Sequence, residues 1–85
     1  GQILETFGWD ISPNPASSSA IITMPHGAPL SEIRIYDASG RIVERIIPSD
    51  VEFFNLDLSN LNVGLHYITV RTIGGASSTQ KLLVD

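Results

Sequence analysis

The residues of this 85-residue chain that could bind a metal or act in catalysis are few and lie far apart. The chain has no cysteine and two histidines: His26, in a loop bounded by proline and glycine, and His66, at the start of an expected strand. A zinc site needs three or four ligands at characteristic spacings, and neither histidine has a second one nearby. We therefore expect no metal site and no cofactor.

No serine or carboxylate lies in a recognisable catalytic setting. The serines do not occur in a Gly-x-Ser-x-Gly nucleophile elbow, and the serine-rich stretches have the composition of loops. Asp50, Glu52 and Asp57 do not follow the alternating spacing of a calcium-binding loop, which also needs a glycine at its centre. Without an activated nucleophile or an acid–base pair, the sequence indicates a domain that is not an enzyme and has no catalytic residues.

Aromatic side chains are the remaining candidates for chemistry, because flat rings on a β-sheet can stack on sugars. The candidates are Trp9, Tyr36, Phe53, Phe54 and Tyr67. Each would bury roughly 150–250 Å² in a core, and so small a domain needs such residues inside, so we favour core packing. Exposure of Trp9 would instead favour a role in binding carbohydrate.

The charge of the chain excludes several classes of partner. Five basic residues against nine acidic ones give a net charge of -4, so we expect no nucleic-acid partner and no anionic membrane surface. No apolar run approaches the ~20 residues that span a bilayer. The first residues, Gly1-Gln2-Ile3-Leu4, lack the features of a signal peptide, so we expect any export signal to lie upstream.

The elements that must position these side chains are short strands. Apolar runs rich in Ile, Val and Leu alternate with turn residues about every ten residues, which is typical of a β-sandwich or barrel. We expect strands near residues 7–11, 20–24, 32–37, 41–47, 54–58, 65–72 and 79–84. The predicted fold is an all-β, Ig-like antiparallel sandwich of six to seven strands with Greek-key connections and no helix.

Two segments show the clearest local pattern. Alternation places Ile33 and Ile35 toward the core and Glu32 and Arg34 toward water. The following segment, residues 37–40, predicts a tight turn in which aspartate accepts backbone hydrogen bonds and glycine supplies a positive φ. On the second strand, residues 20, 22 and 24 share one face, and a later connection is expected to be anchored by a leucine at position 61 that packs under the sandwich.

Three groups of residues, in this order, resemble one known family. Pro13-Asn14-Pro15 precedes a serine-rich approach to a strand; an Ile-x-Ile-Tyr-Asp-Ala-Ser-Gly-Arg segment covers residues 33–41; and Leu61-x-x-Gly64 precedes an alternating strand and the ending Gln-Lys-Leu-Leu-Val at 80–84. Over about residues 11–85, their order and spacing resemble the C-terminal sorting domain of type IX secretion substrates, of the type A class found in Bacteroidetes.

The resemblance implies a targeting role. Proteins of this family enter the periplasm by an N-terminal signal peptide, and the outer-membrane translocon then recognises the folded C-terminal domain. A sortase-like peptidase commonly removes the domain, and the passenger is released or attached to the cell surface. Residues 11–85 would be the sorting domain, and residues 1–10 a linker or first edge strand that follows an upstream passenger domain.

The resemblance also implies which residues the translocon recognises. They come from the three groups above: Pro13, Asn14, Pro15, Asp37, Gly40, Arg41, Leu61, Gly64, Lys81, Leu82, Leu83 and Val84. The edge of the terminal strand could be recognised by strand addition, and an exposed edge strand would also permit weak self-association.

One position departs from the family pattern and leaves two interpretations open. Family members usually carry tyrosine two residues after the glycine that begins the penultimate strand, whereas here Gly64 is followed at that position by His66, with Tyr67 one residue later. Either a half-buried histidine with a hydrogen-bond partner replaces the tyrosine, or a one-residue shift in register brings Tyr67 to the core.

The alternative to a sorting domain is an Ig-like accessory module of an extracellular enzyme. Such a module would bind carbohydrate, with Trp9 as the stacking residue, or would act as a spacer.

Overall fold

The structure, a computed structural model, describes residues 8–50 and 52–85. These residues contain seven β-strands. The strands are β1 (Asp10–Ser12), β2 (Ser19–Thr23), β3 (Leu30–Asp37), β4 (Ile42–Ile46), β5 (Phe53–Asp57), β6 (Gly64–Thr72) and β7 (Ser77–Val84). The described residues form no helix, and thus contain none long and apolar enough to cross a membrane.

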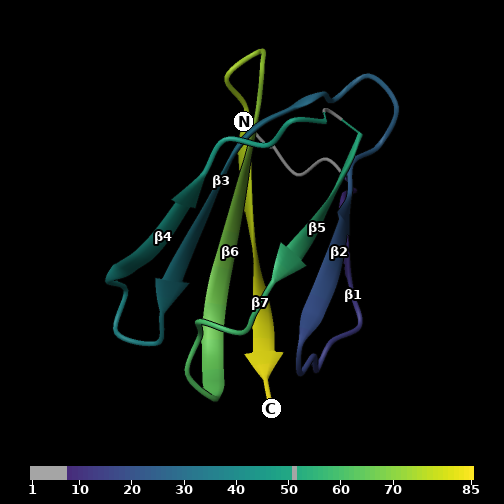
Figure 1. The fold of residues 1–85 in the computed structure, drawn as a ribbon. Helices are drawn as coiled ribbons and strands as arrows, with labels where there is room; N and C mark the ends of the chain where they lie inside the picture. The colour runs from purple at the N-terminus through teal and green to yellow at the C-terminus, as the bar shows by residue number, and fades with distance from the viewer. Residues whose placement is uncertain (1–7, 51) are drawn as a thin grey trace.

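The strands form two antiparallel sheets that lie face to face (Figure 1). One has the order β1-β2-β5 and the other the order β4-β3-β6-β7. The neighbours β2 and β5, and likewise β3 and β6, are distant in the sequence, so the chain passes repeatedly from one sheet to the other. This connectivity confirms the predicted all-β, Ig-like sandwich.

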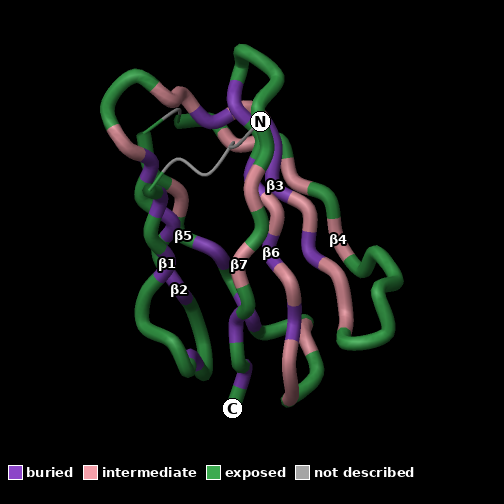
Figure 2. The backbone as a smooth tube through the Cα atoms, turned by 180° about the vertical axis from the view of Figure 1, so that it is seen from behind, coloured by how far each residue is buried: buried purple, intermediate pink, exposed green. Residues whose placement is uncertain are grey.

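The core lies between the two sheets, and burial alternates along the strands (Figure 2). On β2, Ala20 and Ile22 are buried, and Met24 directly after the strand is buried with them. On β3, Ile33 and Ile35 are fully buried, as their alternation predicts. Aliphatic side chains dominate this core, which is the reason for the Ile, Val and Leu bias of the sequence.

The first, third and last strands begin two or three residues away from the expected positions, and the third begins at Leu30 instead of residue 32. The first strand begins at Asp10 instead of residue 7, which lies outside the described residues, as do residues 1–6. The last strand begins two residues early, at Ser77, because Thr72 closes the preceding turn tightly. The Thr72 amide donates to the Ala76 carbonyl (2.8 Å) and the Thr72 hydroxyl accepts from the Ala76 amide (3.1 Å), which leaves Ser77 free to pair.

The aromatic residues are less buried than predicted. Trp9 is 4% exposed and belongs to the core, and Phe54 packs against the core. Phe53, however, is 54% exposed, and Tyr36 and Tyr67 are half-buried. The two tyrosines lie opposite each other on β3 and β6, on the face that points away from the core, because Ile and Val occupy the inward positions.

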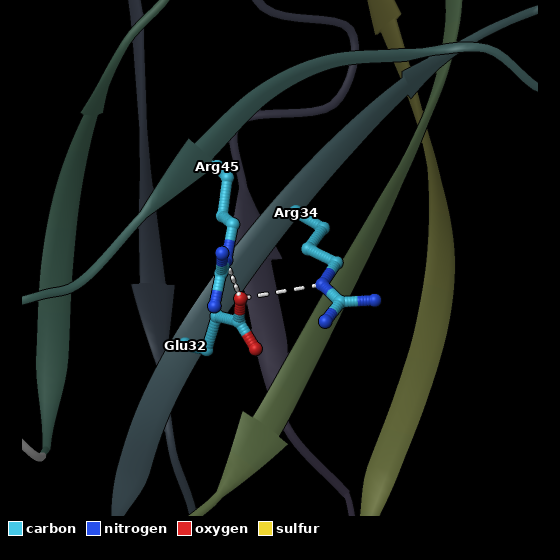
Figure 3. A network of polar contacts seen from close by, with 3 residues as sticks. All are labelled: Glu32, Arg34 and Arg45. Atoms are coloured by element: carbon cyan, nitrogen blue, oxygen red, sulfur yellow. Dashed lines mark hydrogen bonds and ion pairs between the residues drawn. The ribbon is translucent and has the colours of Figure 1, made fainter.

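Glu32 does not face water as predicted, although it lies on the outer face of β3. Its side chain is almost completely covered, because the guanidinium groups of Arg34 and Arg45 both pair with its carboxylate (Figure 3). Arg45 belongs to β4, so the strand's own alternation could not indicate this burial.

His66 resolves the question of register in β6. It is 4% exposed and lies on the core face with Ile68 and Val70, whereas Tyr67 is half-buried on the outer face. The His66 Nδ1 lies 3.1 Å from the carbonyl oxygen of Gly64, and because a carbonyl only accepts, the Nδ1–H donates this bond. The histidine therefore replaces the tyrosine without a shift in register, and it is more buried than expected.

Candidate functional site

The residues that the sequence motifs single out gather at one end of the sandwich. We call it the lower end (bottom of Figure 1); it comprises residues 13–18 after β1, the β3–β4 turn at 37–41, the β5–β6 loop at 58–64 and the last residues of β7, 81–85. The strand register brings these segments together, because Asp37 pairs with His66, and Gly64 with Val84.

The β3–β4 turn is organised by the carboxylate of Asp37. Its Oδ1 accepts from the Ser39 amide (3.0 Å), the Ser39 hydroxyl (2.6 Å) and the Arg41 amide (3.0 Å). The Gly40 amide donates to the Asp37 carbonyl (2.9 Å), and Gly40 has a φ of 90°, a conformation that disfavours other residues. The Ser39 hydroxyl, and next the Arg41 amide, lower the pKa of Asp37 from its ordinary value. The predicted turn is present.

Two leucines, Leu58 and Leu61, anchor the β5–β6 loop to the core. Leu58 is buried, and its carbonyl accepts from the Leu61 amide (3.0 Å). Leu61 packs against the core as expected. Gly64 ends the loop with a φ of 134°, and Val63 immediately before it is 78% exposed. The loop thus presents an apolar side chain to solvent beside the first residue of β6.

The turn and the loop face each other across a groove of about 350 Å³. Asp37 and Ser39 line one side of it, and Leu61, Val63 and Leu65 line the other. The structure therefore brings together Asp37, Leu61 and Gly64 at one groove, with Gly40 and Arg41 in the same turn. The sequence did not identify Val63 and Leu65 as the apolar lining of this groove. The one signal that could have indicated it is the aliphatic side chain of Val63 between Asn62 and Gly64.

The Pro-Asn-Pro segment covers the outer edge of β7 at the lower end. The Asn14 Nδ2 donates to the Lys81 carbonyl (3.0 Å), and the Leu83 amide donates to the Asn14 Oδ1 (3.1 Å). The Ala16 amide donates to the Leu83 carbonyl (2.9 Å), and the Asp85 amide donates to the Ala16 carbonyl (2.8 Å). The side chain and backbone of this segment thus act as a short additional strand next to β7. The part played by Ala16 was not identified from the sequence.

The four terminal residues singled out on β7 divide between the core and the surface. Leu82 and Val84 are buried, whereas Lys81 and Leu83 are exposed. This division follows from the two-residue period of a strand. Of these four side chains, only the exposed pair is available to a partner while the domain is folded.

The other residues considered for metal binding, catalysis or carbohydrate binding do not lie together in the described part of the chain. Among residues 8–50 and 52–85, no group of three or more histidine, aspartate or glutamate side chains is arranged to hold a metal ion. The Nδ1 of His66 is occupied by the Gly64 carbonyl. Trp9 is buried, so its ring is not available to stack on a sugar.

Comparison with known protein families gives one match. The model of a family described as the secretion system C-terminal sorting domain matches residues 10–85, which include all seven strands. No curated protein matches the chain.

Proposed function

Since the chain belongs to the family of secretion system C-terminal sorting domains, we propose that the lower end is the surface that the type IX secretion system recognises. Domains of this family are non-catalytic and direct the proteins that carry them through this system to the cell surface or beyond. The observation that carries the proposal is that all three motifs meet at this end: the β3–β4 turn and the β5–β6 loop line one groove, and the Pro-Asn-Pro segment lies along the last residues of β7.

Within the lower end, we assign recognition to the groove and to the exposed side chains. The groove offers hydrogen-bonding atoms at Asp37 and Ser39 and an apolar wall at Val63, while Arg41 and Lys81 supply positive charge nearby. Gly40, Leu61, Gly64, Leu82 and Val84 act indirectly, because they hold the backbone and core that position these groups.

Strand addition to the lower half of β7 is not the mode of recognition that we propose. Its outer backbone groups are already bonded to Asn14 and Ala16, so a partner strand would first have to displace residues 13–16. The Pro-Asn-Pro motif accordingly has a structural role, in that Pro13 and Pro15 flank the asparagine that closes this edge.

The finer steps of the pathway are also proposals. The order and spacing of the motifs support the type A class. Transit through the periplasm, recognition by the outer-membrane translocon and removal by a sortase-like peptidase with release or attachment of the passenger follow from that class. A domain boundary near residue 10 is supported by the starts of β1 and of the family match. Weak self-association stays a prediction, with β4, at the edge of the larger sheet, as the strand that would pair.

A reporter fusion tests the proposed function. The chain is joined to the C-terminus of a periplasmic reporter with its own signal peptide, in a host that has the type IX apparatus. We expect the reporter at the cell surface or in the medium only when the domain is attached, with a mass that shows removal of the domain. Retention of the fusion in the periplasm, at the level of the reporter alone, would overturn the proposal.

A further inference from the structure

The basic residues of this acidic chain are concentrated on the outer face of the larger sheet. Arg34 and Arg45 are direct cross-strand partners, and Arg71 lies opposite Glu32. Lys81 lies opposite Tyr67, whose ring is on the same face. Cross-strand partners project from the same side of a sheet, so this face carries four of the five basic residues, Arg41 being the fifth.

Three of these cations surround a single carboxylate. The Nε groups of Arg34 and Arg45 both donate to Oε2 of Glu32, at 3.3 Å from Arg34 (Figure 3). With Arg71, three positive charges stand against one negative charge, which leaves a net charge of +2. The hydrogen bond from Arg45, and after it that from Arg34, lowers the pKa of Glu32, so the carboxylate stays ionised and keeps both guanidinium groups in place.

A small hollow of about 110 Å³ lies in this basic surface. It is lined by Glu32, Arg34, Thr69, Arg71, Gly75 and Ser77. Its volume corresponds to about three or four water molecules at roughly 30 Å³ each, enough for one tetrahedral oxyanion. The guanidinium groups of Arg34 and Arg71 and the hydroxyl of Ser77 provide donors. The Thr69 hydroxyl lies 2.7 Å from the Thr79 hydroxyl and is a further donor when it accepts its hydrogen bond from Thr79. Arg71 forms no side-chain hydrogen bond or ion pair within residues 8–50 and 52–85.

We propose that this hollow is a binding site for a phosphate or sulfate group, held by Arg34 and Arg71 and oriented by the two hydroxyls. Guanidinium groups bind tetrahedral oxyanions through charge-assisted hydrogen bonds, and here the Glu32 carboxylate pre-positions one of them. The site lies toward the starts of β3 and β7, whereas the lower end contains their last residues, so it is separate from the proposed recognition surface.

Titration with inorganic phosphate tests this site. Backbone amide shifts of the isotopically labelled chain are followed by NMR at constant ionic strength, with chloride as the balancing anion. We expect saturable shifts confined to the lining residues, and the same response to sulfate. Glucose 6-phosphate, added separately, distinguishes the source: tighter binding than inorganic phosphate assigns a phosphorylated sugar, and equal binding assigns the free ion.

Two variants with the same change in charge supply the control. Arg71→Gln should weaken phosphate binding about tenfold or more, because a charge-assisted contact is lost. Arg41→Gln, at the lower end, should leave the affinity unchanged. Unsaturable shifts, or equal weakening by both variants, would show a non-specific effect of charge and would overturn the proposal.

Discussion

Two side chains at the lower end substitute for backbone. Asn14 offers a carbonyl oxygen and an amide to β7 in the positions that a neighbouring strand would use, and the Asp37 carboxylate gathers two amides and a hydroxyl in its turn. Such contacts fix the shape of the groove and of the terminal strand, so single substitutions there should have measurable effects.

The hydrogen bonds of Asn14 to β7 predict a loss of stability on truncation. Asn14→Ala removes two hydrogen bonds and should lower the free energy of unfolding by about 1–2 kcal/mol, measured by urea denaturation. Hydrogen exchange at the Leu83 amide should become faster. Asn62→Ala, in an exposed loop, is the control and should change neither quantity; equal effects of the two changes would contradict the role of Asn14.

The Asp37 turn predicts a dependence on pH with a definite sign. Because the folded-state pKa of Asp37 lies below its unfolded value, ordinarily about 3.9, its contribution to stability is complete above that value and is lost as the pH falls through the folded-state pKa. Ser39→Ala removes the largest cause and should raise the pKa of Asp37, measured by NMR titration of its carboxyl carbon. Ser49→Ala should leave it unchanged; no rise in Ser39→Ala would refute this account of the turn.

At the scale of the element, β7 combines two functions on its two faces. Leu82 is fully buried, whereas its neighbour Leu83 is 44% exposed beside the closed edge. Folding thus depends on the inward residues, and any recognition of side chains depends on the outward ones.

This division predicts separable effects on stability and secretion. Leu82→Ala should destabilise the domain by about 2–5 kcal/mol, because it leaves a cavity in the core. Leu83→Ala should cost less than about 1 kcal/mol and yet reduce the exported fraction of a reporter fusion. Normal export of a stable Leu83→Ala fusion would remove this side chain from the recognition surface.

The elements also show how far the sequence can predict the structure. Alternation correctly placed Ile33 and Ile35 in the core, because the period of a strand is a local property, but it left open whether His66 or Tyr67 faces inward. Burial of Glu32 could not be predicted, since it depends on Arg45 from another strand. The contact of Asn14 with β7 likewise joins residues 67 positions apart, although the sequence did identify both partners as motif residues.

At the scale of the whole molecule, the two ends of the sandwich differ in the residues that they carry. The lower end holds the groove and every motif residue that was assigned to recognition, while the β6–β7 turn at the upper end holds none of them (Figure 1). Val63, in a loop at the lower end, is 78% exposed, and Ile73, in the β6–β7 turn at the upper end, is 64% exposed. These two residues form a matched pair for locating the recognition surface.

The most direct test compares Val63→Asp with Ile73→Asp in the reporter fusion, after both variants are shown to be as stable as the unchanged domain. Both variants add one negative charge and remove an exposed aliphatic side chain, and they do so at opposite ends of the sandwich. We predict that Val63→Asp retains the reporter in the periplasm and that Ile73→Asp exports it normally. Export of both variants at the level of the unchanged domain, or retention of Ile73→Asp alone, would contradict recognition at the lower end.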